Sequence, residues 1–165
     1  MNLKRTLKHF FAPHWIVNRA FPRRALSAIG NAIGESEKLH DGELRFAVEA
    51  GLHPASLWRG LTTRQRAEEL FASLHVWDTA HNSGVLIYVQ LVDRRIEIVA
   101  DRGISAKVLQ VQWDAICLRM EAAFRARRFE AGALAAIAEV TALLAQHFPP
   151  RGDNPNELPD RPVVL

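Results

Sequence analysis

The sequence lacks the residue patterns by which enzymes are most readily identified. It contains one cysteine, Cys117, so neither an internal disulfide nor a cysteine-based zinc site can form. No Ser-His-Asp order, glycine-rich phosphate loop or His-Glu-x-x-His helix is present. These absences exclude the commonest sequence signatures of serine hydrolases, NTPases and zinc peptidases.

Acidic residues are absent from the first 34 positions, and the first one is Glu35. That stretch holds six basic residues, whereas the rest of the chain holds 15 basic and 18 acidic residues. A basic arm on a slightly acidic domain favours an anionic partner for the arm. We expect the contacts with that partner to be made by Lys4, Arg5, Lys8, Phe10, Phe11, Trp15 and Arg19.

Within the arm, residues 3–11 are expected to form a short helix that ends before Pro13. One interpretation is an interfacial anchor on anionic lipid, and the other is a frayed terminus or a helix packed on the domain. Nucleic acid is not an expected partner, because the rest of the chain has no basic groove signature.

Long hydrophobic runs are also missing, and the N-terminus has no signal-peptide pattern. We therefore expect no transmembrane segment. The expected location is the cytoplasm, with a peripheral position on the inner membrane surface as the alternative.

The centre of the fold is predicted to be residues 82–103. Residues 85–89 form a short apolar run, typical of a strand buried on both faces. Asp93 and Arg94 interrupt the pattern, and residues 95–100 then alternate as a second strand. The short break predicts an antiparallel hairpin.

An earlier strand is predicted over residues 44–48, where apolar and polar side chains alternate. A loop follows, with Trp58 expected to pack onto the core. Thr62 and Gln65 have the spacing of a capping box, and helical periodicity continues to Leu74. This strand, this helix and the strand at Val85 predict a right-handed, parallel βαβ crossover.

Three further helices are predicted from periodicity, over residues 22–40, 113–124 and 134–148. Gly30 and Gly34 weaken the first helix, so we expect another element to pack closely against them. The stripe of the second helix comprises Trp113, Ile116, Cys117, Met120 and Phe124. It makes Cys117 a core residue rather than a nucleophile.

Arg125, Arg127 and Arg128 come at the C-terminal end of the second helix, where cations suit the helix dipole. A solvated basic end is a better interpretation than a phosphate clamp, because phosphate sites favour helix N-termini. Overall, the pattern predicts a basic, aromatic arm over residues 1–21, a domain over 22–148 and a proline-rich extended tail over 149–165. The tail is expected either to lie over the domain or to be mobile.

Several residues together resemble the TPM-domain family. They are Asn82, Gly84, Val85 and Leu86 before the hairpin, the Gly-Ile turn after it, and Arg128, Phe129, Glu130 and Gly132 at the last helix. The resemblance covers residues 22–148 and implies an α/β fold: a three-layer α/β/α sandwich around a small mixed sheet. The βαβ crossover and the hairpin agree with that fold.

The family includes a thylakoid lumen protein with acid phosphatase activity, a photosystem repair factor and a receptor auxiliary subunit. The resemblance also implies that some members bind calcium or another divalent cation in loops at one end of the sheet. This chain departs from the commoner pattern at Ser83, where a second Asn is usual, and at Ser105 and Gln110, where carboxylates are frequent.

Polar residues near the strand ends could form one site, because strand ends in α/β sheets gather ligands. The parallel crossover and the hairpin place the starts of the first two strands beside the end of the third. A site for Ca²⁺ or another divalent cation would use Asp41, Glu43, Asp78, His81, Asn82 and Asp101. The alternative is that Asp41, Asp78 and Asn82 form Asx turns and that Asp101 pairs with Arg102.

The sequence therefore favours a non-catalytic accessory or interaction protein with a protein partner, acting at a membrane surface and binding a divalent cation weakly. The alternative is a weak, metal-assisted acid phosphatase that uses the strand-end carboxylates.

Overall fold

The computed structural model describes residues 9, 15–152 and 155–165. Its centre is a four-stranded sheet in the order β3-β2-β1-β4. The strands are β1 (Glu43–Glu49), β2 (Gly84–Gln90), β3 (Arg95–Ala100) and β4 (Val163–Val164). β1 pairs in parallel with β2 and β4, and β2 pairs antiparallel with β3, so the sheet is mixed as predicted.

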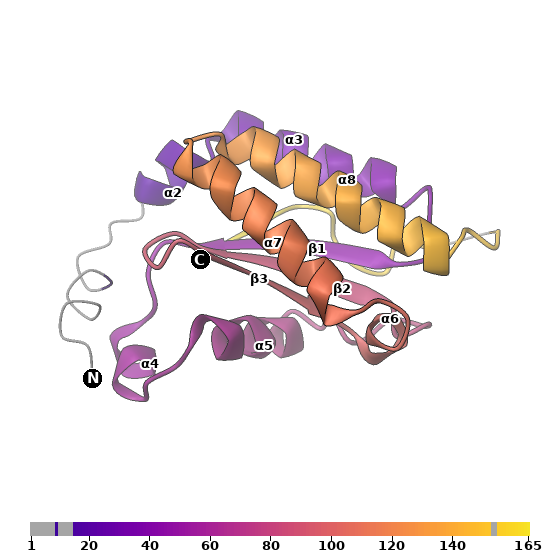
Figure 1. Cartoon of the computed structure of the whole chain (residues 1–165), viewed down its shortest axis with the longest axis horizontal. Coiled ribbons are helices and arrows are strands. Elements are labelled where there is room, and N and C mark those ends of the chain that lie inside the picture. Colours follow the sequence, from indigo (N-terminus) through magenta and orange to yellow (C-terminus); the bar gives the residue numbers. More distant parts are fainter. Residues whose placement is uncertain (1–8, 10–14, 153–154) are drawn as a thin grey trace.

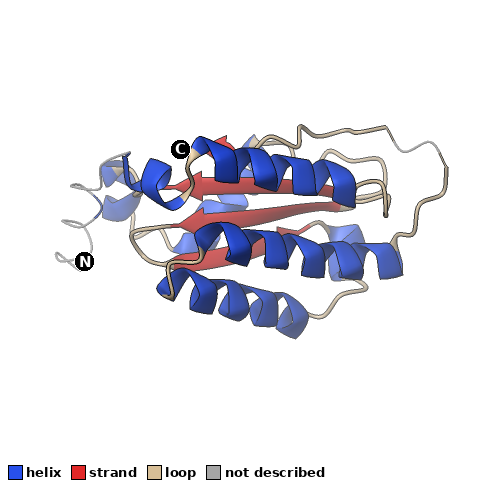
Figure 2. Cartoon of the chain, turned by 90° about the horizontal axis from the view of Figure 1, so that it is seen from above, coloured by secondary structure: helices blue, strands red, loops and turns tan. Residues whose placement is uncertain are grey.

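Helices cover both faces of the sheet (Figure 1). Three long helices lie side by side on one face (Figure 2): α3 (Arg23–Ser36), α7 (Gln110–Arg125) and α8 (Phe129–His147). The other face carries α4 (Pro54–Trp58) and α5 (Thr63–Ser73). The short helices α2 (Trp15–Ala20) and α6 (Arg102–Ser105) lie at opposite ends of the molecule. The three-layer α/β/α sandwich is confirmed.

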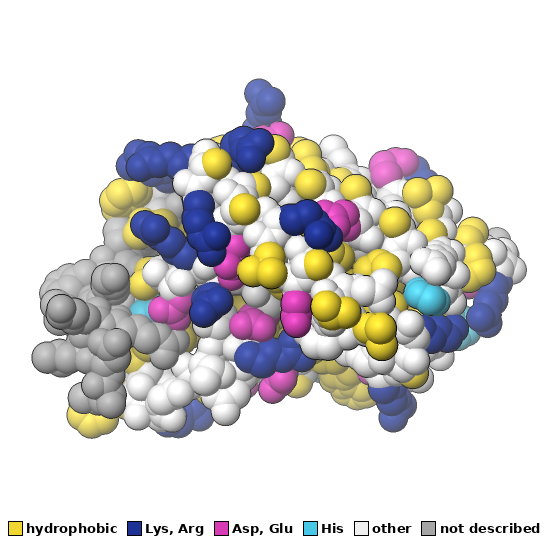
Figure 3. Space-filling view, in the orientation of Figure 1, with side chains coloured by type: hydrophobic (Ala, Val, Ile, Leu, Met, Phe, Trp, Pro, Cys, Tyr) yellow, Lys and Arg dark blue, Asp and Glu magenta, His cyan; other side chains and the backbone are white. Residues whose placement is uncertain are grey.

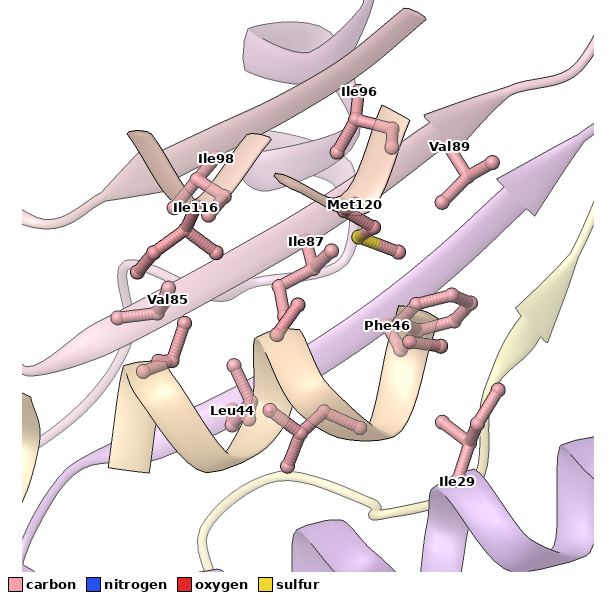
Figure 4. Packing of buried hydrophobic residues seen from close by; sticks show 14 of the residues in the cluster. Ile29, Leu44, Phe46, Val85, Ile87, Val89, Ile96, Ile98, Ile116 and Met120 are labelled. Carbon is pink, nitrogen blue, oxygen red and sulfur yellow. The ribbon is translucent and has the colours of Figure 1, made fainter. Parts of the chain in front are cut away.

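The main core lies between the sheet and the three long helices (Figure 4). Alternate residues of β1, namely Leu44, Phe46 and Val48, point into this core, and Met120 of α7 meets them with 1% of its surface exposed. A smaller cluster on the opposite face joins Ala47, Leu86 and Tyr88 to α5. Both faces of β1 and β2 are buried, as expected for strands between two helical layers.

The capping box is confirmed. The Thr62 hydroxyl accepts a hydrogen bond from the Gln65 amide at 3.1 Å, and the Gln65 side chain accepts one from the Thr62 amide at 3.0 Å. This cap begins α5, which makes the crossover between the parallel strands β1 and β2. By contrast, Trp58 is the last residue of α4, and 75% of its surface is exposed. The expected packing of Trp58 on the core is therefore wrong.

The packed domain begins before Pro22. Val17, Ala20 and Phe21 belong to the main core, and the Phe21 ring contacts Phe46 edge-on at 5.7 Å between ring centroids. The predicted boundary after residue 21 is therefore too late. The predicted helix over residues 3–11 lies outside the described residues, apart from His9.

The C-terminal segment is part of the fold and lies over the domain. Residues 155–162 run along α3 and β1, Leu158 is buried, and the Leu165 amide donates to the Val48 carbonyl at 3.0 Å. A side chain in place of Gly34 would place its Cβ 2.6 Å from an Asp160 carboxylate oxygen, so the predicted close packing against this helix is confirmed. We call residues 155–165 the C-terminal strap.

In the part of the chain that the structure describes, one helix, α8, is long and apolar enough to span a membrane by length and composition. The hydrophobic pattern of the sequence predicts none. Gly132, Ala136 and Leu144 of this helix are buried against the rest of the domain, so α8 has the contacts of a core helix.

The position of Met120 generates a stability prediction. Met120→Ala should lower the free energy of unfolding by about 2–5 kcal/mol, since it leaves a cavity in the main core. Leu118→Ala, on the same helix but 62% exposed, should change it by less than about 0.5 kcal/mol. Urea unfolding of both variants measures the difference, and equal effects would contradict this assignment of the helix faces.

Candidate functional site

The sheet brings four of the predicted site residues, Asp41, Glu43, Asn82 and Asp101, to one edge, which we call the strand-start edge. Glu43 of β1 pairs with Gly84 of β2, and Val85 pairs with Ala100 of β3. Asp41, Asn82 and Asp101 flank these strand ends, as the predicted topology required. The polar groups at this edge are connected mainly through the backbone.

Asn82 and Asp101 serve the turn between β3 and α6. The Asn82 side-chain carbonyl accepts a hydrogen bond from Arg102 Nε at 2.9 Å, and one Asp101 carboxylate oxygen accepts from the Arg102 amide at 2.6 Å. The second Asp101 oxygen is buried and has no hydrogen-bond partner among the described residues. Neither contact is an Asx turn, in which the side-chain oxygen accepts from the amide two residues later, because Asn82 accepts from a side chain and Asp101 from the next amide.

Asp41 is tied to the segment that follows α8. Its carboxylate accepts from the Arg151 amide at 3.2 Å, and its carbonyl oxygen accepts from the Ser83 hydroxyl at 3.0 Å. Ser83, where the family pattern has Asn, thus joins the starts of β1 and β2. The Asp41 carboxylate points to the C-terminal segment and not to Asp101.

Asp78 and His81 are exposed and lie in the loop before β2. The described contacts of Asp78 are made by its backbone, whose amide donates to the His75 carbonyl. Neither side chain has a described contact with Asp41 or Asp101. Within the described ranges, no group of three or more His, Cys, Asp or Glu side chains is arranged to hold a metal ion. One buried carboxylate oxygen falls short of the six to eight oxygen ligands that Ca²⁺ takes, so a cation at this edge stays a prediction from the sequence.

The Glu43 carboxylate anchors the C-terminal strap. Its two carboxylate oxygens accept hydrogen bonds from the amides of Glu157 at 3.3 Å and Leu158 at 3.1 Å. Burial raises the pKa of Glu43 to about 7, although these two amides act in the opposite direction. A carboxylate predicted as a metal ligand therefore binds backbone amides instead.

A second buried acid, Glu37, lies beside Glu43 and was not a predicted site residue. Its carboxylate accepts from the Leu44 amide at 3.0 Å, and burial raises its pKa to about 8, with Glu43 and Asp160 adding repulsion. Arg45, also buried, is the positive charge near these acids, and burial lowers its pKa. The alternation of β1 marked Arg45 as solvent-facing, because no local pattern shows that a strap from the far end of the chain covers it.

A group of exposed basic side chains lies at the opposite end of the molecule, around α2 and the α7–α8 turn (Figure 3). Of the predicted anionic contacts, Lys4, Arg5, Lys8, Phe10 and Phe11 lie outside the described residues. Trp15 and Arg19 are both exposed on α2. The structure adds Arg94 of the β2–β3 turn and Arg95 at the start of β3, which line a pocket with Arg19, Arg125 and Arg127.

Cys117 carries no chemistry in this structure. Burial raises the pKa of its thiol to about 12, so the thiolate that a nucleophile needs is not formed at neutral pH. Its predicted role as a packing residue is confirmed by its contact with the main core.

Comparisons with known proteins agree on the fold. A family model described as the TPM domain matches residues 20–143. The solution structure of the BA42 protein from the psychrophilic bacterium Bizionia argentinensis is similar, with a TM-score of 0.76 and 29% identity over 86% of this chain and 93% of that one. The N-terminal domain of a protein from P. gingivalis, at 16% identity, shares the fold with a TM-score of 0.60 over 79% of this chain and 82% of that one. No curated protein matches this sequence.

The buried acids generate a pH prediction. Glu37 and Glu43 have an ordinary pKa of 4.5, which the fold raises to about 8 and about 7. The native protein therefore keeps protons that the unfolded chain has already released, so this stabilisation is complete below pH 4.5 and is lost as the pH rises to about 8. The expected slope is at most about 1.4 kcal/mol per pH unit for each group.

Glu37→Gln and Glu43→Gln should each flatten the dependence of unfolding free energy on pH, as measured by urea unfolding across that range. Glu35→Gln is the matched control, since Glu35 is exposed at the end of α3, two residues before Glu37. If both buried variants keep the wild-type slope, these acids are not the source of the pH dependence.

Proposed function

The chain belongs to the TPM-domain family, and we propose that it is a non-catalytic accessory protein of that family that docks on an anionic membrane surface. The docking region comprises α2 and the basic segment that precedes it in the chain. This proposal joins the charge asymmetry of the sequence to the exposed face of α2.

The observation that carries the proposal is the orientation of α2. Val17 and Ala20 are buried in the core, whereas Trp15 is 57% exposed and Arg19 lies beside it on the outer surface. An exposed tryptophan next to cations suits the boundary between headgroups and acyl chains, where an indole ring is amphipathic. Because its other face is packed, α2 presents these side chains on a rigid support.

Charge supports the same surface. Arg23 and Arg24 are exposed at the start of α3, immediately after α2, and no acidic residue precedes Glu35 in the chain. Each basic residue near an anionic membrane contributes about 1 kcal/mol of attraction. Since a single short anchor binds only marginally, the basic N-terminal residues and α2 are proposed to act together.

A non-catalytic role is supported by the use that the fold makes of its polar groups. The carboxylates of Asp41, Glu43 and Asp101 accept hydrogen bonds from backbone amides, which ties them to structural tasks. Among the described residues, no observation favours the alternative of a metal-assisted phosphatase. The protein partner expected from the sequence belongs to the same proposal: it would meet the accessory protein at the membrane surface.

Vesicle co-sedimentation tests the docking. The full chain should bind vesicles of phosphatidylglycerol and not vesicles of phosphatidylcholine, and binding should weaken as salt is added. Trp15→Ser combined with Arg19→Glu should weaken the apparent affinity by about tenfold or more, since it removes an apolar anchor and reverses one charge. Lys38→Glu, an equal charge change at the far end of α3, is the control.

Two results would contradict membrane docking. One is equal binding of the double variant and the control variant. The other is an absence of binding by the wild-type chain to phosphatidylglycerol at low salt.

A further inference from the structure

A pocket of about 540 Å³ lies where α2, the β2–β3 turn and the end of α7 meet. We call it the arginine pocket. Its charged lining consists of one acid, Glu121, and five bases: Arg19, Arg94, Arg95, Arg125 and Arg127. These arginines come from three separate segments, and the fold brings them to one cavity.

The positive charge of the pocket is only partly neutralised. Glu121 is 6% exposed and pairs with Arg125 at 2.9 Å and with Arg95 at 3.8 Å. Within the described part of the chain, Arg19, Arg94 and Arg127 have no acidic partner. One glutamate thus holds two guanidinium groups in position while three others are left for an anion.

Two of these arginines occupy backbone positions that favour glycine. Arg94 has φ 54° and Arg127 has φ 58°, both in the left-handed region. Arg127 follows α7 in a Schellman motif, in which the Arg127 amide donates to the Phe124 carbonyl and the Arg128 amide to the Ala123 carbonyl. Glycine is the usual residue at that position. Since an arginine strains the backbone there, we attribute its presence to its side chain.

Apart from Gln90, the rest of the lining is apolar. Val89 and Ile96 are buried, and Ile16, Phe124 and Phe129 are partly buried around them. A guanidinium group can donate two hydrogen bonds to the oxygens of one phosphate. An apolar floor favours a ligand that also carries hydrocarbon. A small inorganic anion would use only the first of these features, whereas an amphiphilic phosphate uses both.

We propose that the arginine pocket binds the phosphate headgroup of an anionic phospholipid, with the adjoining hydrocarbon on the apolar floor. This inference rests on the proposed membrane docking and assigns a ligand class to the same end of the molecule. Arg19, Arg94 and Arg127 contact the phosphate, and Glu121 positions Arg95 and Arg125. Trp15, one residue before Ile16 of the pocket, lies at the same surface.

The left-handed backbone at two of the arginines provides a test that does not depend on destabilising the protein. Arg94→Gly combined with Arg127→Gly removes two phosphate contacts and relieves the backbone, so Tm should equal or exceed the wild-type value. His75→Gly is the matched control, because His75 also has a positive φ, 56°, and lies outside the pocket.

Titration calorimetry with dihexanoyl phosphatidic acid, kept below its micellar concentration, measures binding to the pocket. The wild-type chain and His75→Gly should bind it equally, and the double glycine variant should bind at least about tenfold more weakly. Inorganic phosphate should bind more weakly than the lipid, and dihexanoyl phosphatidylcholine, which carries no net charge, should bind more weakly still.

Three outcomes would overturn the proposal: no binding of the short-chain lipid, equal binding by the double variant, or inorganic phosphate binding as tightly as the lipid. Vesicle binding without binding of the short-chain lipid would reject the pocket and leave membrane docking intact. Conversely, arginine-dependent binding of the short-chain lipid without vesicle binding would support the pocket and reject membrane docking.

Discussion

The close approach of two backbone segments at Gly84 fixes the start of β2, and much of the structure depends on it. A Cβ at this position would lie 1.8 Å from the Val76 carbonyl oxygen, so a side chain cannot be accommodated without moving the backbone. With β2 held there, Gly84 pairs with Glu43 of β1, and the hairpin returns β3 to the same edge. This register buries both faces of β1 and β2, and each face then needs a helical layer to cover it.

The same register explains why the strand-start edge is polar although its described side chains are not arranged to hold a metal ion. Three strand ends meet there, and each leaves backbone amides and carbonyls that need partners. The side chains of Asp41, Ser83 and Asp101 supply some of those partners. Glu43 does so for the C-terminal strap, which closes the open edge of β1 and brings β4 into the sheet. The acids at this end therefore accept hydrogen bonds that join segments of the chain.

The sequence predicted the elements whose pattern is local. The strands at residues 84–90 and 95–100, the capped helix α5 and the stripe of α7 were all recovered, because their periodicity lies within one segment. The topology also placed Asn82 beside Asp101 correctly. The sequence could not predict where each carboxylate points. Asp41 and Glu43 accept hydrogen bonds from the amides of Arg151 and Leu158, which come more than 100 residues later in the chain. The helix α2, with six residues, and the strand β4, with two, are too short to show a period.

The arginines at the other end show the same limit with a different outcome. Arg125 and Arg127 looked like a solvated helix end, and Arg94 looked like an ordinary turn residue, because each was considered within its own segment. Only the fold brings them together with Arg19 around an apolar floor. Neighbouring guanidinium groups repel one another. Two of these arginines also adopt a left-handed backbone conformation that glycine would adopt more easily. Stability alone favours an acid or a glycine at some of these positions, so the presence of arginine there supports the proposal that the pocket receives an anion.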